Sequence, residues 1–459
     1  MQPEILKAQT NLNLVISGGL MLGLAGTAII SGWWSLVRGP DLLTRTDNPR
    51  RTIADRYVKR GSILDSRSNP LAESSGVTGA YQRLYPYAAL SPLVGYTDSI
   101  YGQAGLEASL DPYLRGLKGY PALTLWREHL LYGQPPPGLD VRLSLDLNLQ
   151  TRADELLAGH KGALVLLNAH TGEVLAMASS PGFDANQLNS TWESLVSDPN
   201  SPLLDRAGMG MYPVGNALGG FLLSASQVDP AAQYTGNNNV GCAVVPAGST
   251  WGEVLAAGCP EPMKQLLSSM SGQDLIKFID QLGLYTAPSF PVETLSSTKP
   301  SAISDPFNYV TGQNNDVTTG GLFQVTPLQM ALAAATLSNQ GTLPAPRLVM
   351  SVDTPQSGWV TLPLTTQPQQ AFPAVSANQA AGALMSGDMP FWQVVASGEG
   401  IASSTEAVNS IYPGYSWYLG GTSPEWQGVP LALAVVLEED NPQQVQEIGQ
   451  AMFQSAIIP

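Results

Sequence analysis

The stretch GALVLLNAHTGEVLAMASS, residues 162–180, contains two apolar runs separated by the polar turn Ala169-His170-Thr171-Gly172. Two short apolar runs joined in this way predict a β-hairpin. Near the end of the chain, WYLGG (417–421) and PLALAVVLEE (430–439) predict two more strands, and QQVQEIGQAMFQSAI (443–457) predicts a closing helix. Strands at both ends with helices between them predict an α/β (α+β) sandwich whose sheet joins sequence-distant strands.

The chain immediately before this hairpin also has regular patterns. Val141, Leu143 and Leu145 alternate with polar residues, as a half-buried strand would, and residues 147–157 have the apolar spacing of a helix. The Pro-rich run QPPPG at 134–138 predicts a hinge between domains. These patterns divide the chain into an N-terminal domain over 39–138 and a larger domain over 139–459.

An uncharged stretch from Ala8 to Val37 precedes both domains. A spanning helix needs about 20 apolar residues, so the prediction is a transmembrane helix over 8–37. Trp33 and Trp34 lie at one end, where interfacial aromatic residues are expected. A cleaved signal peptide is the alternative, but Arg38-Gly39-Pro40-Asp41 is a poor cleavage site. The basic residues after the span would, by charge alone, place the large domain in the cytoplasm.

Composition excludes several functions. The formal net charge of −15 repels nucleic acid phosphates, and no basic stripe offsets it. Three histidines and the two cysteines, Cys242 and Cys259, are too scattered for a metal site, so no metal or other cofactor is predicted. The cysteines leave two alternatives open, which are a disulfide outside the cytoplasm and a pair of buried thiols.

Short strings along nearly the whole chain resemble class B penicillin-binding proteins, the cell-wall transpeptidases. In the N-terminal part these strings are Arg60-Gly61-Ser62-Ile63-Leu64-Asp65, Pro70-Leu71-Ala72, Tyr85-Pro86, Gly95-Tyr96, Gly105-Leu106-Glu107 and Leu114-Arg115-Gly116. In the C-terminal part they are Asp146 with Gln150, residues 171–176, Ser180-Pro181 with Phe183-Asp184, and Thr326-Pro327-Leu328-Gln329-Met330-Ala331. The resemblance implies an elongated N-terminal pedestal or dimerisation-like domain, then a transpeptidase domain with the serine β-lactamase-like fold. It also implies that the large domain lies outside the cytoplasmic membrane.

A transpeptidase of this class needs three motifs, S-x-x-K, S-x-N and K-T-G. The serine is acylated, and the lysine one helical turn later accepts its proton. Aligned with the family's Y-P-P-G-S-T-x-K, this chain has Asn216 at the serine position and Gly219 at the lysine position. No catalytic residue is therefore intact in the first motif.

The other two motifs are also replaced. Gly258 and Pro260 stand at the serine and asparagine positions of S-x-N, and Gly398 and Glu399 stand at the lysine and threonine positions of K-T-G. Strings elsewhere imitate the motifs, but none has suitable surroundings. Lys299 of Ser296-Ser297-Thr298-Lys299 precedes Pro300, which disfavours a helix there. The remaining imitations are Ser376-Ala377-Asn378, His170-Thr171-Gly172, Ser224, Ser226 and Cys259 as a reactive thiol.

Three functions remain as hypotheses. The first is a catalytically inactive pseudo-transpeptidase of cell-wall synthesis or division, a scaffold or regulator and not an enzyme. Its implied partners are the membrane, a polytopic glycan polymerase or other cell-wall and division proteins, and a peptidoglycan peptide. The alternative is an active D,D-transpeptidase or carboxypeptidase with a non-standard nucleophile, and the third is an unrelated structural role outside the membrane.

Overall fold

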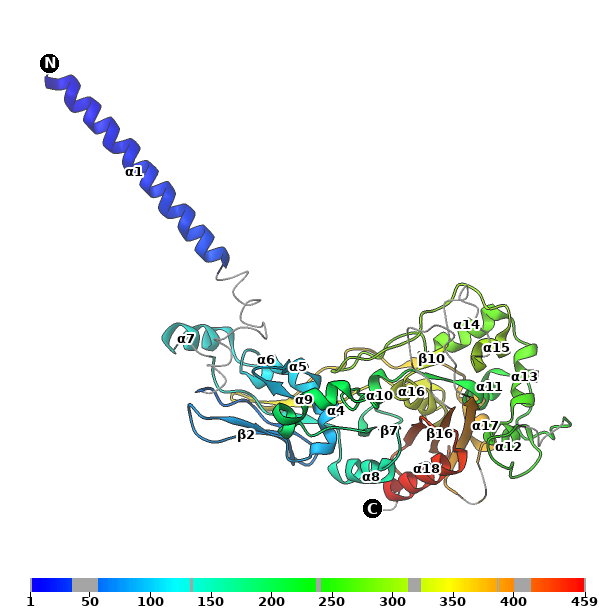
Figure 1. Ribbon diagram of the computed structural model, residues 1–459. Coiled ribbons are helices and arrows are strands. Elements are labelled where there is room, and N and C mark those ends of the chain that lie inside the picture. Colours follow the sequence, from blue (N-terminus) through cyan, green and yellow to red (C-terminus); the bar gives the residue numbers. More distant parts are fainter. Residues whose placement is uncertain are drawn as a thin grey trace.

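The computed structural model describes residues 2–34, 57–132, 135–236, 241–312, 323–385, 387, 389–399 and 414–457. Figure 1 shows a long N-terminal helix, α1, followed by an elongated folded part in two regions. The helix covers Gln2–Trp33, and its apolar segment Leu14–Trp33 has a mean hydropathy of 1.9 with none of it buried. It is long and apolar enough to cross a membrane. Residues 35–37 of the predicted span lie outside the described residues.

The N-terminal region is built on a six-stranded sheet with the order β13-β12-β6-β1-β2-β3. Short helices and strands surround this sheet, and α7 lies at the end of the region toward α1 (Figure 1). The strands and helices here are β1 (Ile63–Leu64), β2 (Pro70–Ser75), β3 (Gln82–Leu84), η2 (Ala88–Leu90), α4 (Ser91–Val94), β4 (Thr97–Asp98), β5 (Gly102–Gln103), α5 (Gly105–Ser109), α6 (Asp111–Leu114), α7 (Ala122–Tyr132), β6 (Val141–Leu143), β12 (Val349–Thr354) and β13 (Gly358–Thr361).

Strands from both sides of the predicted hinge therefore share this sheet. Ile63 of β1 pairs in parallel with Val141 of β6, and Val141 pairs with Val352 of β12. The β12–β13 hairpin reaches back from the large region to the N-terminal one. The boundary between 39–138 and 139–459 remains a prediction, and backbone hydrogen bonds of this sheet join the two regions.

A five-stranded antiparallel sheet with the order β15-β16-β17-β7-β8 forms the centre of the large region. The predicted hairpin is β7 (Gly162–Asn168) and β8 (Val174–Ser180), and Leu431 of the distant β17 pairs with Asn168. The other strands are β15 (Phe391–Glu399), β16 (Gly414–Thr422) and β17 (Leu431–Leu437). This confirms the predicted α/β class and the pairing of sequence-distant strands.

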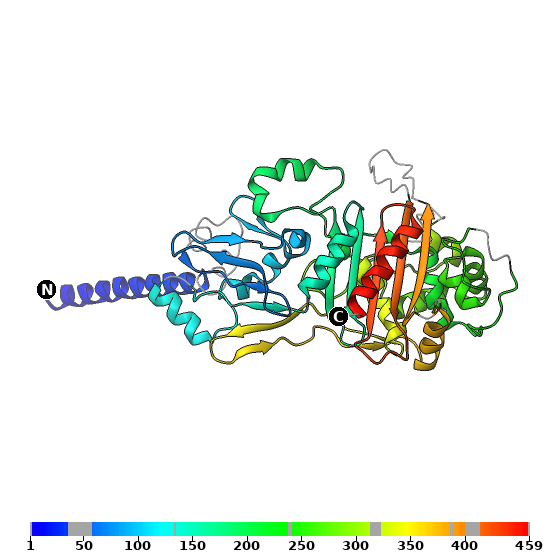
Figure 2. The same ribbon diagram turned by 90° about the horizontal axis from the view of Figure 1, so that it is seen from below.

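Helices cover both faces of the central sheet. The closing helix α18 (Pro442–Ile457) and α8 (Leu147–Leu157) pack on one face, where Phe453 and Val445 are fully buried (Figure 2). The buried helix α16 (Pro327–Ser338) packs on the other face against β17, β7 and β16. Side-chain caps fix where these helices begin. Asp146 accepts a hydrogen bond from Asn148 N, and Thr326 and Gln329 form a capping box.

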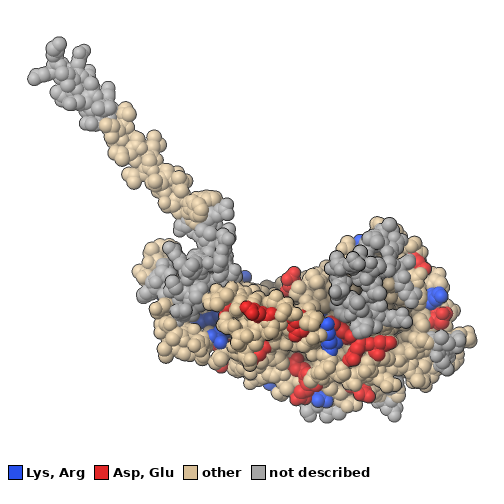
Figure 3. Space-filling view, viewed as in Figure 1, with Lys and Arg blue, Asp and Glu red and all other residues tan. Residues whose placement is uncertain are grey.

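The remaining elements lie around α16 or link the two regions. They are η3 (Ala185–Gln187), α9 (Leu188–Ser197), α10 (Arg206–Met209), β9 (Tyr212–Pro213), η4 (Gly215–Leu218), α11 (Gly219–Ala225), α12 (Trp251–Ala256), α13 (Pro260–Ser268), α14 (Gly272–Gln281), α15 (Pro306–Thr311), β10 (Gln324–Val325), β11 (Thr342–Leu343), β14 (Gln369–Gln370) and α17 (Ala374–Ala383). The surface view shows more acidic than basic surface on this side of the folded part, in keeping with the net charge of −15 (Figure 3).

Candidate functional site

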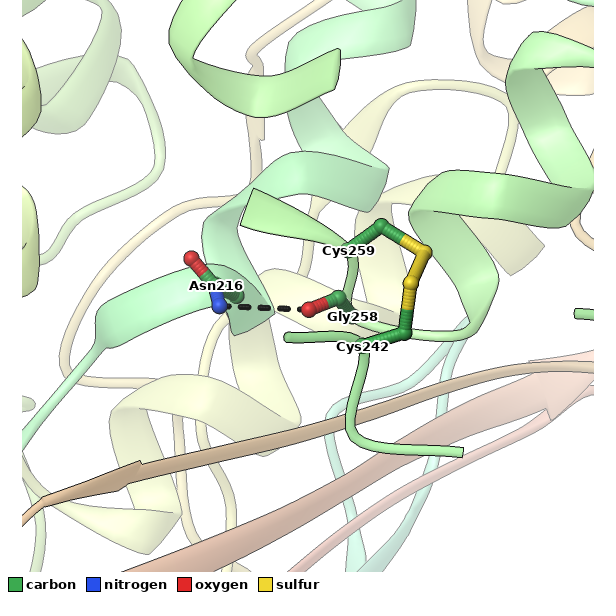
Figure 4. Close-up of a disulfide and its surroundings, with 4 residues drawn as sticks. All are labelled: Asn216, Cys242, Gly258 and Cys259. Carbon is green, nitrogen blue, oxygen red and sulfur yellow. Dashed lines mark hydrogen bonds between the residues drawn. A yellow bond between two sulfur atoms is a disulfide. The ribbon is translucent and has the colours of Figure 1, made fainter. Parts of the chain in front are cut away.

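The residues predicted at the three motif positions lie close together in the large region. The first lies on η4 at the start of α11, the second on the turn between α12 and α13, and the third at the end of β15. Asn216 Nδ2 donates a hydrogen bond of 3.1 Å to the carbonyl oxygen of Gly258 (Figure 4). The backbone of Gly258 lies against Val395 and Ala396 of β15. The structure therefore brings the three predicted positions together at one junction, and their correspondence with the family motifs stays a prediction.

At the nucleophile position, Asn216 is half-buried and its two polar atoms differ in environment. Its amide nitrogen donates a hydrogen bond to the carbonyl oxygen of Gly258, whereas its Oδ1 is buried without a hydrogen-bond partner among the described residues. An amide nitrogen has no lone pair available for nucleophilic attack, and no base lies one helical turn later. Gly219 is buried there, and a Cβ at this residue would lie 3.0 Å from Leu255 Cδ2. A lysine at 219 would therefore extend among apolar side chains.

At the second motif, backbone geometry limits residue 258 to glycine. Gly258 has φ +67, and a Cβ added to it would lie 2.3 Å from the carbonyl oxygen of Val395. A serine at this residue needs both an unfavourable backbone conformation and a movement of β15. Pro260 begins α13, where its missing N–H costs nothing. Both residues have structural roles, and neither offers the hydroxyl or amide of S-x-N.

Cys259, between Gly258 and Pro260, decides whether the two cysteines form a disulfide or remain thiols. Cys259 forms a disulfide with Cys242, at a sequence separation of 17, and the described chain has no free cysteine (Figure 4). Cys259 is therefore neither a free buried thiol nor a reactive one. The disulfide holds residues 241–244 against the turn, where Ala243 N also donates to Ala257 O.

At the third motif, Gly398 pairs with Tyr415 and Glu399 with Gly414 across β15 and β16. A Cβ on Gly398 would lie 2.4 Å from the Tyr415 hydroxyl, and so would a Cβ on Gly215. The Tyr415 ring therefore fills the space between the two glycines. Its side chain is buried, and this burial raises the pKa of the phenol, with the nearby Asp440 carboxylate acting in the same direction. The side chain of Glu399 is outside the described residues.

Among the described residues, no hydrogen bond, ion pair or ring contact joins a lysine to Asn216, Gly258 or Gly398. Lys161 pairs with Glu438 at 2.8 Å, and Lys264 lies over the ring of Phe307. Lys277 is exposed on α14, and Lys299 pairs with Asp280 at 2.7 Å. No lysine follows Lys299 in the sequence, so β15 and the chain after it contain no lysine.

The strings that imitate the motifs lie elsewhere. Ser296 and Lys299 lie in an irregular segment, and the Ser296 hydroxyl donates to Tyr285 O. The hydroxyl of Ser224 is buried and donates to Phe221 O, while Thr171 and Gly172 form the β7–β8 turn. Among the described residues, no three His, Cys, Asp or Glu side chains form a group that could hold a metal ion.

Sequence reasoning missed Tyr415. No motif marks it, and its importance comes from the strand register that places it opposite Gly398. The one signal in the sequence is the pair of glycines, at 215 and 398, where the family has a glycine and a lysine.

Comparison with known proteins gives matches to two families. Residues 60–141 match the family described as "Penicillin binding protein A dimerisation domain", and residues 225–407 match "Penicillin binding protein transpeptidase domain". The second match begins after the nucleophile position. Its range includes the second and third motif positions.

Among curated proteins, peptidoglycan D,D-transpeptidase PbpA of Mycolicibacterium smegmatis is 29% identical over 377 residues, which are 72% of this chain and 73% of the relative. Peptidoglycan D,D-transpeptidase MrdA of Escherichia coli is 27% identical over 62% of this chain, and the match spans about half of the relative, 54%. Among solved structures, PBPA from Mycobacterium tuberculosis has a TM-score of 0.72 at 22% identity, covering 87% of this chain and 99% of that one. An imipenem acyl-enzyme complex of the same tuberculosis protein has a TM-score of 0.72 at 23% identity, covering 88% of this chain and 100% of that one. At these identities the solved structures establish the shared fold.

Proposed function

Because the chain belongs to the class B penicillin-binding proteins, with their dimerisation and transpeptidase domains, we propose that it serves peptidoglycan synthesis by binding and not by catalysis. The observation that carries this proposal is the junction of Asn216, Gly258 and Gly398. The three motif positions come together as the fold requires, yet they supply no nucleophile, base or cation. The chain is then a pseudo-transpeptidase that keeps the scaffold of the enzyme.

The expected loss in the rate of acyl transfer is large. Removing the nucleophile of a serine hydrolase typically costs on the order of 10⁶ in rate, and here the base is missing as well. The substrate carboxylate would also lose its partner, because Gly398 replaces the lysine of K-T-G. Tyr415 fills the neighbouring space with a phenol whose raised pKa keeps it neutral. A neutral hydroxyl is a weaker partner for a carboxylate than an ammonium group.

The proposed location is the outer side of a cytoplasmic membrane, with α1 as a single-pass anchor. The disulfide between Cys242 and Cys259 supports this location, since disulfides persist in oxidising compartments. The proposed partners are a polytopic glycan polymerase or other cell-wall and division proteins, and a peptidoglycan peptide in the remnant cleft. The pedestal over 39–138 and the transpeptidase-like domain over 139–459 are part of this proposal.

An active D,D-transpeptidase is the second candidate, and the relatives favour it. PbpA and MrdA are both named as peptidoglycan D,D-transpeptidases, and a protein of the same fold forms an acyl-enzyme with imipenem. This function requires a nucleophile outside the usual positions. Tyr415 places a hydroxyl at the junction, but burial disfavours the phenolate that would attack.

Direct β-lactam labelling separates the two candidates. The full-length protein in detergent is incubated with a fluorescent penicillin, and intact mass measures any adduct against a heat-denatured sample. M. smegmatis PbpA serves as the matched positive control. The expected result is labelling of PbpA and none of this chain above the denatured sample. A stoichiometric adduct would overturn the proposal, and Tyr415→Phe would then test whether Tyr415 is the acylated residue.

A further inference from the structure

Helix α7 has an exposed apolar face at the membrane end of the molecule. Leu123, Trp126, Leu130 and Leu131 are 60–73% exposed. Their spacing of three, four and one residues places them on one side of the helix. Arg127, between them on the same side, is 61% exposed and pairs with Glu128. Burying such a face is favourable, so an exposed apolar group of this size is typical of a surface that docks on something.

Two views place this face beside the anchor. Figures 1 and 2 both show α7 at the end of the folded part from which α1 extends, far from the helices around α12 and α14. In both views this is the end of the folded part that is nearer to α1. We infer that α7 docks on the lipid surface beside the anchor, with its apolar side chains inserted among the headgroups. The inference rests on the membrane anchoring proposed above.

The distribution of charge along the chain favours lipid over a protein partner. Residues 1–138 contain 13 Lys and Arg against 10 Asp and Glu, whereas residues 139–459 contain 8 against 26. Anionic headgroups therefore attract the part that carries α7 and repel the large region. Between the anchor and the folded part the sequence has five arginines against three aspartates, which are Arg38, Arg45, Arg50, Arg51 and Arg56 against Asp41, Asp47 and Asp55.

The side chains of the face fit the headgroup region. An interfacial helix has Trp and Leu on its apolar side and basic residues that reach the phosphates, and Trp126 and Arg127 supply both types. The face is also small for a stable protein interface. Eleven residues of helix are about 16 Å long, whereas a stable partner typically covers about 800 Å² on each side. A second copy of the chain bound to α7 alone would have too little area.

Fluorescence quenching by labelled lipids tests this docking in the full chain. The two native cysteines are joined in a disulfide, so a single added cysteine takes the environment-sensitive fluorophore. Three variants are reconstituted in vesicles of phosphatidylethanolamine and phosphatidylglycerol that contain doxyl-labelled lipid. Leu130→Cys reports on α7, Leu22→Cys on the anchor, and Val375→Cys on an exposed site of α17 in the large region.

The expected result is strong quenching at 22 and 130 and at least five-fold less at 375. Quenching at 22 with none at 130 would overturn the docking and leave the anchor in place. No quenching at 22 would overturn both proposals. A blue-shifted emission at 130 without doxyl quenching would mean that protein, such as a second copy, covers α7, and would also overturn the docking.

A charge variant adds a matched control. Leu123→Glu in the Leu130→Cys background places a carboxylate in the apolar face, and it should lower the quenching at 130 at least five-fold. Val375→Glu in the same background should change it less than two-fold. Both substitutions are at exposed positions, so both proteins should fold. Equal quenching in the two variants would overturn the docking.

Discussion

The backbone at Gly258 restricts this residue, the predicted position of the S-x-N serine, to glycine. Its left-handed φ of +67 suits glycine, and the carbonyl oxygen of Val395 occupies the place of a Cβ. A chain with serine at this position would need a different path for the turn or for β15. The glycine at 258 is therefore part of how the junction packs.

Alanine at Gly258 should destabilise the protein more than alanine at Gly159. Gly159 also has a left-handed φ, +84, but a Cβ there meets nothing within 4 Å. The backbone cost of roughly 1–2 kcal/mol is common to both, whereas the contact with Val395 adds about 1–3 kcal/mol at Gly258 alone. Urea unfolding of both variants measures the difference. Equal losses of unfolding free energy would contradict the close approach of β15.

Asp205 should make stability depend on pH. Its carboxyl caps α10, and burial raises its pKa to about 7, although hydrogen bonds from Gly208 and Ala207 oppose the shift. In the unfolded chain the pKa is about 3.9. The folded state therefore binds the proton more tightly, and this contribution to stability is present below about pH 4 and lost as pH rises towards 7.

The change Asp205→Asn removes this titration and keeps an oxygen that caps the helix. Relative to the native protein, the variant should gain unfolding free energy, by on the order of a few kcal/mol, when pH is raised from 5 to 8. The exposed cap Asp305 of α15 provides the control, since Asp305→Asn should show a much smaller change. Denaturant unfolding at the two pH values measures both. A difference that is independent of pH would argue against a protonated Asp205.

At the scale of elements, the disulfide ties a connecting segment to the replaced motif. It joins Cys242 to Cys259, directly before α13, and Cys259 is the residue between Gly258 and Pro260. The same turn holds Asn216 through the Gly258 carbonyl. The covalent link thus stabilises the place where the three motif positions meet.

Replacing both cysteines by serine should lower the unfolding free energy by about 3 kcal/mol, because the closed loop of 17 residues no longer restricts the unfolded chain. Unfolding followed with and without a thiol reductant measures this effect. The native protein should lose stability in reductant, and the double serine variant should be insensitive to it. A native protein that is equally stable in reductant would contradict a stabilising disulfide at this position.

The sequence predicted the elements whose pattern is local. The helix over 147–157, the hairpin over 162–180 and the closing helix lie within about a residue of α8, β7–β8 and α18. These segments have regular apolar spacing and clear turn or cap residues, so their periodicity was sufficient. The return of β12–β13 to the N-terminal sheet was not predicted, because strand pairing over such distances leaves no periodic signal in either strand.

Part of the candidate site could also be predicted, because its residues lie in short local sequence strings. The motif strings predict Asn216, Gly258 and Gly398 as motif positions, and the structure brings these residues together. The role of Tyr415 depends on the register between β15 and β16. The disulfide depends on the path of the loop before α12. The role of Tyr415 and the disulfide both depend on tertiary structure, so local sequence patterns do not predict them.

At the scale of the whole molecule, net charge is divided between the two regions. The part up to residue 138 has an excess of basic residues, and the part after it has a large excess of acidic ones. Near an anionic bilayer, this division attracts the anchor end and repels the transpeptidase-like end. We therefore expect α7 to face the membrane and the large region, with the junction of the three motif positions, to lie farther from it.

This arrangement predicts a salt dependence for the contact between α7 and lipid. Raising the salt from 0.1 M to 1 M shortens the screening length from about 10 Å to about 3 Å, so it should weaken the electrostatic part of the contact and leave the apolar part. Doxyl quenching of the Leu130→Cys label in anionic vesicles should fall by about half or more, but not to the level of Val375→Cys. In vesicles of neutral phosphatidylcholine the quenching should be weaker from the start and nearly independent of salt, because only Leu123, Trp126 and their neighbours then hold the helix. Quenching that is insensitive to salt in both kinds of vesicle would mean that the apolar face alone positions the folded part on the membrane.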